Sequence, residues 1–173
     1  TAAQLDVNFL GAVRLITAVL PQMRLQGSGH IINMSSIGGY IGLPYNSAYA
    51  ASKFALEGYS ESLRLELHPF NIYVSLIEPE AVATDTLATS IRGAAEPHPA
   101  YAGRSDMLLQ KMRRLGSQSP VTPDSVARVV LQAVQARQPR LRYPVGQQAR
   151  WVPLFKLLMP QILFEKFMLR QWA

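Results

Sequence analysis

The stretch SSIGGYIGLPYNSAYAASK (35–53) decides how the rest of the chain is interpreted. It begins where the β-rich run HIINMSS (30–36) ends, and its first ten residues hold the glycines and the proline of a turn-rich loop. Asn46 or Ser47 can then cap a long helix over about 46–68, which Pro69 ends. The stretch therefore predicts a buried strand, a loop and a helix, in that order.

Hydrophobic spacing outside this stretch predicts further helices and strands. The predicted helices are 2–26, stopped by Gly27, then about 122–137, where Thr122 precedes Pro123 and Asp124, and a helical tail over 147–172 interrupted by Pro153 and Pro160. The predicted strands are 72–79 and 141–145. This alternation is typical of a parallel α/β sheet. Because the sequence opens on a helix, we expect only the C-terminal part of a doubly wound parallel sheet, without its N-terminal strands.

The domain prediction follows from the same pattern. The 173 residues form one partial domain, in which 1–145 is the catalytic half and 146–173 a helical tail. Within the catalytic half, short helical runs and Gly or Pro breakers over about 85–118 are typical of a substrate loop. Neither an internal repeat nor a low-complexity linker divides the chain.

Composition and charge narrow the classes of function. No cysteine is present, so disulfides and cysteine-ligated metal sites are excluded. Residues 1–100 carry a net charge of −3, and residues 101–173 carry +9. The basic residues are scattered among apolar ones rather than grouped with aromatic residues, so we expect a solvated basic face and no nucleic-acid partner. The three histidines are isolated and lack metal-ligand spacing, which predicts no metal site.

Tyr49 and Lys53 carry the most specific chemistry in the opening stretch. They are four residues apart, so both lie on one face of the predicted helix. A protonated lysine close to a phenol stabilises the phenolate and lowers its pKa, and the pair can then act as a general acid and base. Ser36 ends the preceding strand, at the sheet edge where α/β proteins place functional groups. Its hydroxyl could hydrogen-bond a substrate oxygen that changes charge.

Each of these residues also has an ordinary structural interpretation. A tyrosine and a lysine at this spacing usually decorate a solvated helix face, and Ser35 or Ser36 usually caps a loop. The combination of strand, serine, loop and Tyr-x-x-x-Lys is much more specific than any member alone. No G-x-S-x-G turn accompanies the serines, which argues against an α/β-hydrolase.

These residues together resemble the short-chain dehydrogenase/reductase superfamily. The resemblance rests on NMSS (33–36) ahead of YAASK (49–53), on DVNFLG (6–11) and on IEPEAVATD (77–85), and it covers residues 1 to about 145. The longer stretch GGYIGLPYNSAYAASKFALEGYSESL looks particularly like the 17β-hydroxysteroid and retinol dehydrogenase branch. The resemblance implies the C-terminal part of a Rossmann fold.

The resemblance also implies a role for seven residues. Tyr49 would exchange the proton with the substrate oxygen, Lys53 would lower its pKa and hold the nicotinamide ribose, and Ser36 would orient the substrate oxygen. Asn8 would hold a water in the proton relay from Lys53. The remaining three would lie at the nicotinamide: Pro79 shaping the turn, Val82 through its backbone and Thr84 through its hydroxyl.

Two departures from the family pattern bear on cofactor binding. The Thr-Gly-x-x-x-Gly-x-Gly turn and the Asn-Asn-Ala-Gly strand of the family are absent, and GSG (27–29) ends a helix and precedes a strand, the reverse of a dinucleotide loop. Glu80 also stands where the family has the glycine of Pro-Gly. A glutamate there adds negative charge and costs energy if the backbone requires φ > 0.

The sequence thus predicts an NAD- or NADP-dependent oxidoreductase that interconverts an alcohol and a carbonyl on a hydrophobic substrate. The competing hypothesis is a catalytically silent fragment or interaction module that lacks the dinucleotide-binding half. The resemblance implies a homodimer through helices 2–26 and 46–68. We expect a cytoplasmic protein, and the tail either covers the core or substrate pocket or contacts a membrane surface peripherally.

Overall fold

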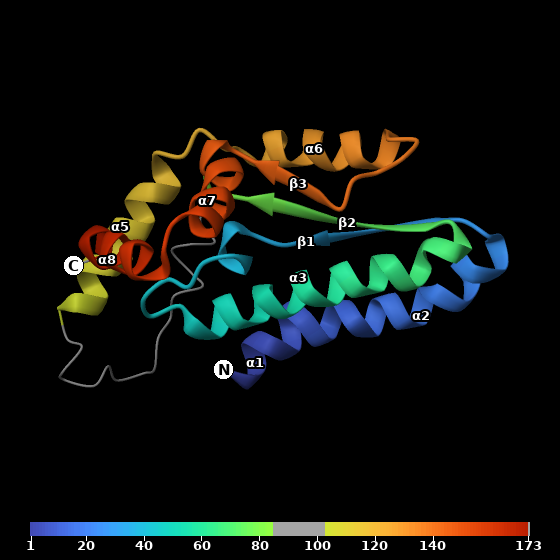
Figure 1. The fold of residues 1–173 in the computed structure, drawn as a ribbon, viewed down its shortest axis with the longest axis horizontal. Helices are drawn as coiled ribbons and strands as arrows, with labels where there is room; N and C mark the ends of the chain where they lie inside the picture. The colour runs from blue at the N-terminus through green and yellow to red at the C-terminus, as the bar shows by residue number, and fades with distance from the viewer. Residues whose placement is uncertain (85–102, 173) are drawn as a thin grey trace.

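The computed structural model describes residues 1–84 and 103–172 (Figure 1). Three strands form a parallel sheet in the order β1 (Gly29–Met34), β2 (Ile72–Pro79) and β3 (Arg142–Val145). In the register of the sheet, Ile31 lies opposite Val74, and Ile77 lies opposite Tyr143. The predicted parallel α/β class is therefore confirmed, and all three predicted strands form with bounds within a residue or two.

Helices cover both faces of the sheet (Figure 1). One face carries α2 (Gly11–Gln26), which α1 (Ala2–Leu5) precedes, and α3 (Ser47–Leu67). The other face carries α6 (Pro123–Gln135). Short 3₁₀ turns at Ile37–Gly39 and His68–Phe70 connect strands and helices. The result is the three-layer arrangement in which parallel strands are buried from both sides.

The core lies on both sides of β2. Between the sheet and the α2–α3 layer, the buried apolar residues are Ile16, Leu20, Ile31, Leu63, Leu67, Ile72 and Val74. Between the sheet and α6, they are Ile77, Val121, Ala133, Tyr143 and Val145. Because β2 is the central strand, its residues from Val74 to Pro79 are all buried. The polar groups that follow β1 and β2 are thereby held on a rigid edge.

The first helix contains an irregular turn at a predicted site residue. A π-helical turn at Asp6–Leu10 separates α1 from α2 and includes Asn8. The whole span Ala2–Gln26 is long and apolar enough to cross a membrane by length and composition. Ile16 and Leu20 of the same span belong to the core, so here it serves as a helix of the domain.

Three local predictions need correction or limits. Asn46 takes the cap position of α3 without a side-chain hydrogen bond to the helix. Its backbone carbonyl accepts from the N–H of Ala50 at 2.9 Å. Pro153 lies inside α7 (Gln147–Leu158) and does not interrupt it, because a proline removes only one backbone bond of a helix that continues on either side. Only Pro160 separates α7 from α8 (Gln161–Trp172).

The predicted substrate loop over 85–118 is described only in part. Residues 85–102 lie outside the described residues. The remainder forms α5 (Arg104–Ser117), a regular helix of 14 residues. The start of α6 agrees with the prediction: Thr122 and Ser125 exchange hydrogen bonds of 3.2 and 3.0 Å with each other's backbone N–H, with Pro123 at the first helical position.

Candidate active site

The site is built where β1 ends at the carboxyl edge of the sheet. Ser35 continues the strand ladder, since its backbone N–H donates to the carbonyl of Ile77 at 2.8 Å. Ser36 then turns into the 3₁₀ turn, and its hydroxyl accepts from the N–H of Gly38 at 3.2 Å and lies 3.4 Å from the carbonyl of Pro79. The end of the strand therefore fixes Ser36 against both β2 and its own turn.

The helix α3 brings Tyr49 and Lys53 to this serine. The hydroxyl of Tyr49 hydrogen-bonds Ser36, and the ammonium of Lys53 lies 5.7 Å from the centre of the Tyr49 ring. Lys53 also donates to the carbonyl of Met34, the last residue of β1, at 2.8 Å. Sequence spacing placed the tyrosine and the lysine on one helix face, and the fold brings that face to the end of the strand.

A glycine makes this close approach possible. A Cβ atom added at Gly38 would lie 2.9 Å from Cε1 of Tyr49, closer than real carbon contacts allow. Any other residue at Gly38 would push the tyrosine ring or the turn away. Gly38 is a position important for the site that sequence reasoning missed, and its signal was the pair Gly38–Gly39, one residue after the serines.

Burial shapes the titration of both groups. Burial raises the pKa of Tyr49 above its ordinary value of 10.0, while the hydrogen bond from Ser36 acts in the opposite direction. Burial likewise lowers the pKa of Lys53 below 10.5, and the negative charge of Glu57 opposes that shift. The expected net lowering of the Tyr49 pKa is thus not what this chain shows, because desolvation outweighs the stabilising contacts around the phenol.

Asn8 lies beside the site through an indirect contact. Its side-chain amide donates to the hydroxyl of Ser52 at 3.1 Å, and Ser52 in turn donates to the carbonyl of Tyr49 at 2.7 Å. The asparagine therefore reaches the backbone of the segment that carries Tyr49 and Lys53. Its π-helical turn changes the direction of the side chain relative to a regular helix, and such turns are frequent at functional sites.

The segment after β2 carries the three predicted nicotinamide contacts. Pro79 is the last residue of the strand and is buried, Val82 is half-buried against the α6 side of the core, and Thr84 is exposed. The backbone N–H of Thr84 donates to the carbonyl of Val82 at 2.8 Å. These residues leave β2 at the same edge of the sheet as Ser36.

Glu80 follows β2 and is directed toward the neighbouring strand end, where β3 leads into α7. Its side chain is buried, and its Oε2 accepts from the backbone N–H of Gln148 at 2.7 Å, at the start of α7. A Cβ atom at Gly146 (φ +101°) would lie 2.2 Å from the Glu80 carboxyl carbon. The carboxylate thus caps α7, where the partial positive charge of a helix start favours it. The substitution at the family's glycine therefore places its charge at α7.

A buried polar cluster beside the site was not predicted from the sequence. The hydroxyl of Ser35 donates to Glu57 at 2.5 Å, and the hydroxyl of Tyr40 donates to Glu78 at 2.7 Å. Nε of Arg142 lies 3.4 Å from a carboxylate oxygen of each glutamate. Burial raises the pKa of Glu78 to about 7. The available signal was Glu57, which lies one helical turn beyond Lys53.

Residues 2–94 match the family described as short chain dehydrogenase, which is more than half of the chain. The chain belongs to the short-chain dehydrogenase family. Retinol dehydrogenase 8 from Bos taurus is 38% identical over 159 residues, which cover 88% of this chain and 50% of that protein. Human 17-beta-hydroxysteroid dehydrogenase type 1 is 38% identical over 164 residues, which cover 90% of this chain and 48% of that protein. Both relatives belong to the branch that the opening stretch resembles.

Solved structures agree with the family assignment. A short-chain dehydrogenase from Streptomyces avermitilis superimposes with a TM-score of 0.71 at 34% identity, over 97% of this chain and 58% of that one. Other solved structures with this fold were determined in complex with NAD or with NADP. The chain spans about half the length of the curated relatives it matches.

The described residues fit one end of a nicotinamide cofactor. A phenol and an ammonium on one helix face, with a serine hydroxyl opposite, supply hydrogen bonds for ribose hydroxyls and for a substrate oxygen. The carboxylate of Glu80 is paired with the backbone N–H of Gln148 at the start of α7. The glycine-rich turn that would hold the pyrophosphate is absent from the sequence, so the fit concerns the nicotinamide end alone.

Proposed function

We propose that the protein is an NAD- or NADP-dependent oxidoreductase that interconverts an alcohol and a carbonyl. The observation that carries this proposal is the convergence of Ser36, Tyr49 and Lys53 at the carboxyl end of β1, with the two hydroxyls hydrogen-bonded to each other. Membership of the short-chain dehydrogenase family supports the same reaction class.

In the oxidation direction, the substrate alcohol gives its proton to the Tyr49 phenolate. A nicotinamide cofactor, when bound, would supply the hydride acceptor for the carbinol carbon, and the alcohol would thereby become the carbonyl. Ser36 donates a hydrogen bond to the substrate oxygen and holds it beside the phenol, and Lys53 supplies the positive charge that favours the phenolate. Asn8 contacts the backbone of Tyr49 through Ser52. We propose that it also holds a water in the proton relay from Lys53.

The cofactor would be held at its nicotinamide end by residues of this chain. Lys53 and Tyr49 would bind the ribose hydroxyls, and Val82 and Thr84 would contact the carboxamide after the turn at Pro79. The residue that selects NAD or NADP follows the glycine-rich turn in this family of folds, so the choice depends on sequence outside these 173 residues.

A hydrophobic substrate is the best-supported class. The relatives at 38% identity are named for retinol and for 17-beta-hydroxysteroids, both apolar alcohols. Apolar side chains are also exposed near the carboxyl edge, on the helices that follow β3. We therefore propose a lipophilic alcohol or carbonyl, bound with the help of the substrate loop that the sequence predicts over about 85–118.

We propose a homodimer through the helices 2–26 and 46–68. The layer formed by α2 and α3 leaves large apolar side chains exposed, among them Leu15, Val19, Phe54 and Leu65. A second copy would cover them, as apolar surface buried between subunits stabilises an obligate dimer. Sedimentation velocity of the protein and of its Leu15→Glu variant tests this: a dimer that the charge converts to a monomer is expected, and a monomeric parent would contradict it.

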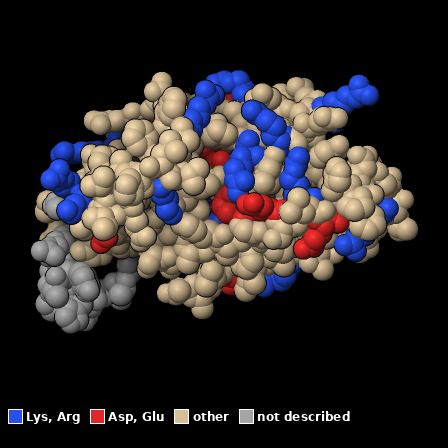
Figure 2. Space-filling model, viewed as in Figure 1, with Lys and Arg blue, Asp and Glu red and all other residues tan. Residues whose placement is uncertain are grey.

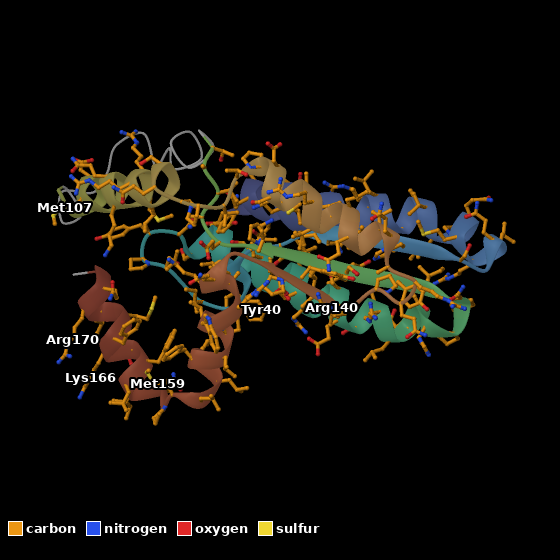
Figure 3. All side chains as sticks on the ribbon, turned by 90° about the horizontal axis from the view of Figure 1, so that it is seen from above. Tyr40, Met107, Arg140, Met159, Lys166 and Arg170 are labelled. Carbon is orange, nitrogen blue, oxygen red and sulfur yellow. The ribbon has the colours of Figure 1, made fainter. Side chains whose placement is uncertain are left out.

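We further propose that the protein is cytoplasmic and contacts a membrane surface through its tail. The exposed apolar side chains of α7 and α8 lie beside Lys156, Lys166 and Arg170. Figure 3 shows the last two of these pointing outward from α8. Co-sedimentation with vesicles of phosphatidylcholine, with and without phosphatidylserine, tests this: binding that requires the anionic lipid is expected, and no binding to either would contradict it.

The competing hypothesis is a silent fragment that keeps the signature without the dinucleotide-binding half. The observation behind it is that these 173 residues contain no glycine-rich dinucleotide turn. The two hypotheses differ in cofactor binding. Calorimetry with NAD and NADP on these 173 residues alone is expected to show little binding, and micromolar affinity would contradict the assignment of the pyrophosphate site to sequence outside them.

Hydride transfer tests the proposed reaction directly. The protein expressed from its complete gene is supplied with NADH or NADPH deuterated at the transferred position, together with retinaldehyde or a 17-keto steroid. Deuterium on the carbinol carbon of the product is expected with one of the cofactors. No transfer from either cofactor to either carbonyl would contradict the proposed substrate class, and no transfer to any carbonyl would favour the silent fragment.

A further inference from the structure

The two adjacent serines after β1 have separate partners on α3. Ser36 hydrogen-bonds Tyr49, while Ser35 donates to Oε1 of Glu57 at 2.5 Å. Tyr49, Lys53 and Glu57 follow one another at four-residue steps, so they line one face of the helix. The serines at the start of this turn therefore contact the helix face at two points, one turn before Lys53 and one turn after it.

The glycines of the turn show how close this attachment is. A Cβ at Gly38 would lie 2.9 Å from the ring of Tyr49, and a Cβ at Gly39 would lie 2.8 Å from Cγ of Glu57. The turn thus presses against both side chains, which leaves little freedom for Ser36 once Glu57 is fixed. Gly39 has an ordinary φ, so the requirement at that position is space and not backbone conformation.

Glu57 itself is fixed from the opposite side by Arg142. The guanidinium lies 3.4 Å from Oε2 of Glu57, 3.4 Å from Glu78 and 2.9 Å from Glu61. Its charge is shared among three carboxylates, two of them buried. In Figure 2, acidic and basic side chains lie side by side across the middle of the face where α3 passes beneath β3. Arg142 comes from β3, so the cluster joins α3 to two strands of the sheet.

The charge of Glu57 also reaches Lys53. The lysine loses hydration on burial, which disfavours its ammonium form, and the nearby carboxylate of Glu57 opposes that loss. The other groups facing the ammonium are the carbonyl of Met34 and the ring of Tyr49, both neutral. Among the described residues, Glu57 is therefore the carboxylate whose charge acts on Lys53, and Arg142, Glu78 and Glu61 contact or neighbour Glu57.

We propose that Glu57 is a positioning residue of the active site, whose carboxylate fixes the turn that carries Ser36 and keeps a negative charge beside the ammonium of Lys53. The proposal rests on the proposed function, since it takes Ser36, Tyr49 and Lys53 as the reacting groups. Glu57 touches neither substrate nor cofactor, and it acts through Ser35 and Lys53. Glu61, one turn further and 56% exposed against 7% for Glu57, is the matched control.

Lysine NMR tests the charge role without any enzymatic assay. The chain has four lysines, so labelling Lys at 13Cε gives four signals, and Lys53→Arg assigns the one of interest. The titration midpoint of Lys53 should fall by about one pH unit in Glu57→Gln and change much less in Glu61→Gln. An unchanged midpoint in Glu57→Gln, or an equal change in Glu61→Gln, would overturn the proposal.

Amide hydrogen exchange tests the role in the turn. Ser35→Ala removes the hydrogen bond and keeps the charge of Glu57, so the amides of Gly39 and Tyr40 should exchange at least tenfold faster while the Lys53 midpoint stays in place. Unchanged protection there would overturn this part of the proposal. If Glu57→Gln does not fold, Ser35→Ala still tests the role of Glu57 in the turn.

The pH profile of turnover links both roles to the reaction. In the protein expressed from its complete gene, Glu57→Gln should lower kcat more than it raises KM, and it should move the alkaline limb of the profile to lower pH. A loss of activity with an unmoved profile would mean a merely structural role. If the Lys53 midpoint moves but no protein form shows turnover, the proposed function fails, and only the effect of Glu57 on the charge of Lys53 is retained.

Discussion

The carboxyl edge around Ser36 and the tail formed by α7 and α8 differ in burial and in the contacts of their side chains. At the edge, hydroxyls, carboxylates and a guanidinium are bonded to one another over buried strands. In the tail, large apolar side chains are exposed along both helices, and Ala149 is the buried member of α7. Figure 3 shows α7 and α8 extending away from the sheet. Fold stability and site geometry therefore reside in the edge and the sheet behind it.

The largest expected effect is a difference in the free energy of unfolding between a substitution in the sheet and one in the tail. Leu76 on β2 is fully buried, so Leu76→Ala should reduce the free energy of unfolding by about 2–5 kcal/mol through lost contacts and a residual cavity. Leu157→Ala on α7, where the side chain is 79% exposed, should change it by less than about 0.5 kcal/mol. Urea unfolding of both variants checks this, and similar losses would contradict the contrast.

A second expected effect concerns the pH dependence of the buried edge. Because the pKa of Glu78 is raised to about 7, the folded state binds a proton that the unfolded state releases above about 4.5. Stability should fall as pH rises from about 4.5 to 7, by up to about 3 kcal/mol from this group. Burial also raises the pKa of Glu57, which adds a slope of the same sign. Glu78→Gln should therefore reduce the slope in urea unfolding measured across this range, and a slope as steep as that of the parent would contradict the assignment.

An intermediate effect is expected where the edge meets the tail. Gly146 has φ +101° and faces the carboxyl group of Glu80, so Gly146→Ala should destabilise the protein by about 1–3 kcal/mol. Glu80→Gln, which keeps the shape of the side chain, should cost about 1 kcal/mol or less through a weaker helix cap. Thermal unfolding of both variants checks the order, and a reversed order would contradict it.

The smallest expected effect lies at the rim of the polar cluster. Glu61 pairs with Arg142 at 2.9 Å but is largely exposed, so Glu61→Gln should change the free energy of unfolding by about 0–1 kcal/mol. Added salt should reduce this difference further. Urea unfolding at low and high salt measures it. A loss as large as that of Leu76→Ala would show that the exposed member of the cluster is as important as its buried core.

The same comparison shows which features of the fold and the site could be predicted from the sequence. The strands, the long helices and the Ser36–Tyr49–Lys53 group were predicted because hydrophobic period, turn residues and motif spacing are local properties. The partners of Glu57 and Glu78 were not, because Arg142 and Ser35 are far from them in sequence and meet only in the folded sheet. The continuous α7 was missed because a proline's effect depends on the surrounding helix.

Glu80 illustrates a second limit of local interpretation. From the sequence, a glutamate at a glycine position predicted strain and an unfavourable charge beside the cofactor. The structure pairs its carboxylate with the N–H of Gln148, a residue 68 positions away along the chain. The effect of a polar substitution in a motif can therefore be interpreted only when its partner is known. For Glu80, that partner lies in the tail.

The central claim is that Tyr49 is the proton-transfer group of a short-chain dehydrogenase. The most direct test is kcat/KM for NAD(P)H-dependent carbonyl reduction by the protein expressed from its complete gene, compared between Tyr49→Phe and Tyr59→Phe. Tyr59 lies on the same helix but packs against the α2 side of the core. A loss of at least about 100-fold in Tyr49→Phe, with Tyr59→Phe unchanged, is expected. Retained activity in Tyr49→Phe would contradict the account.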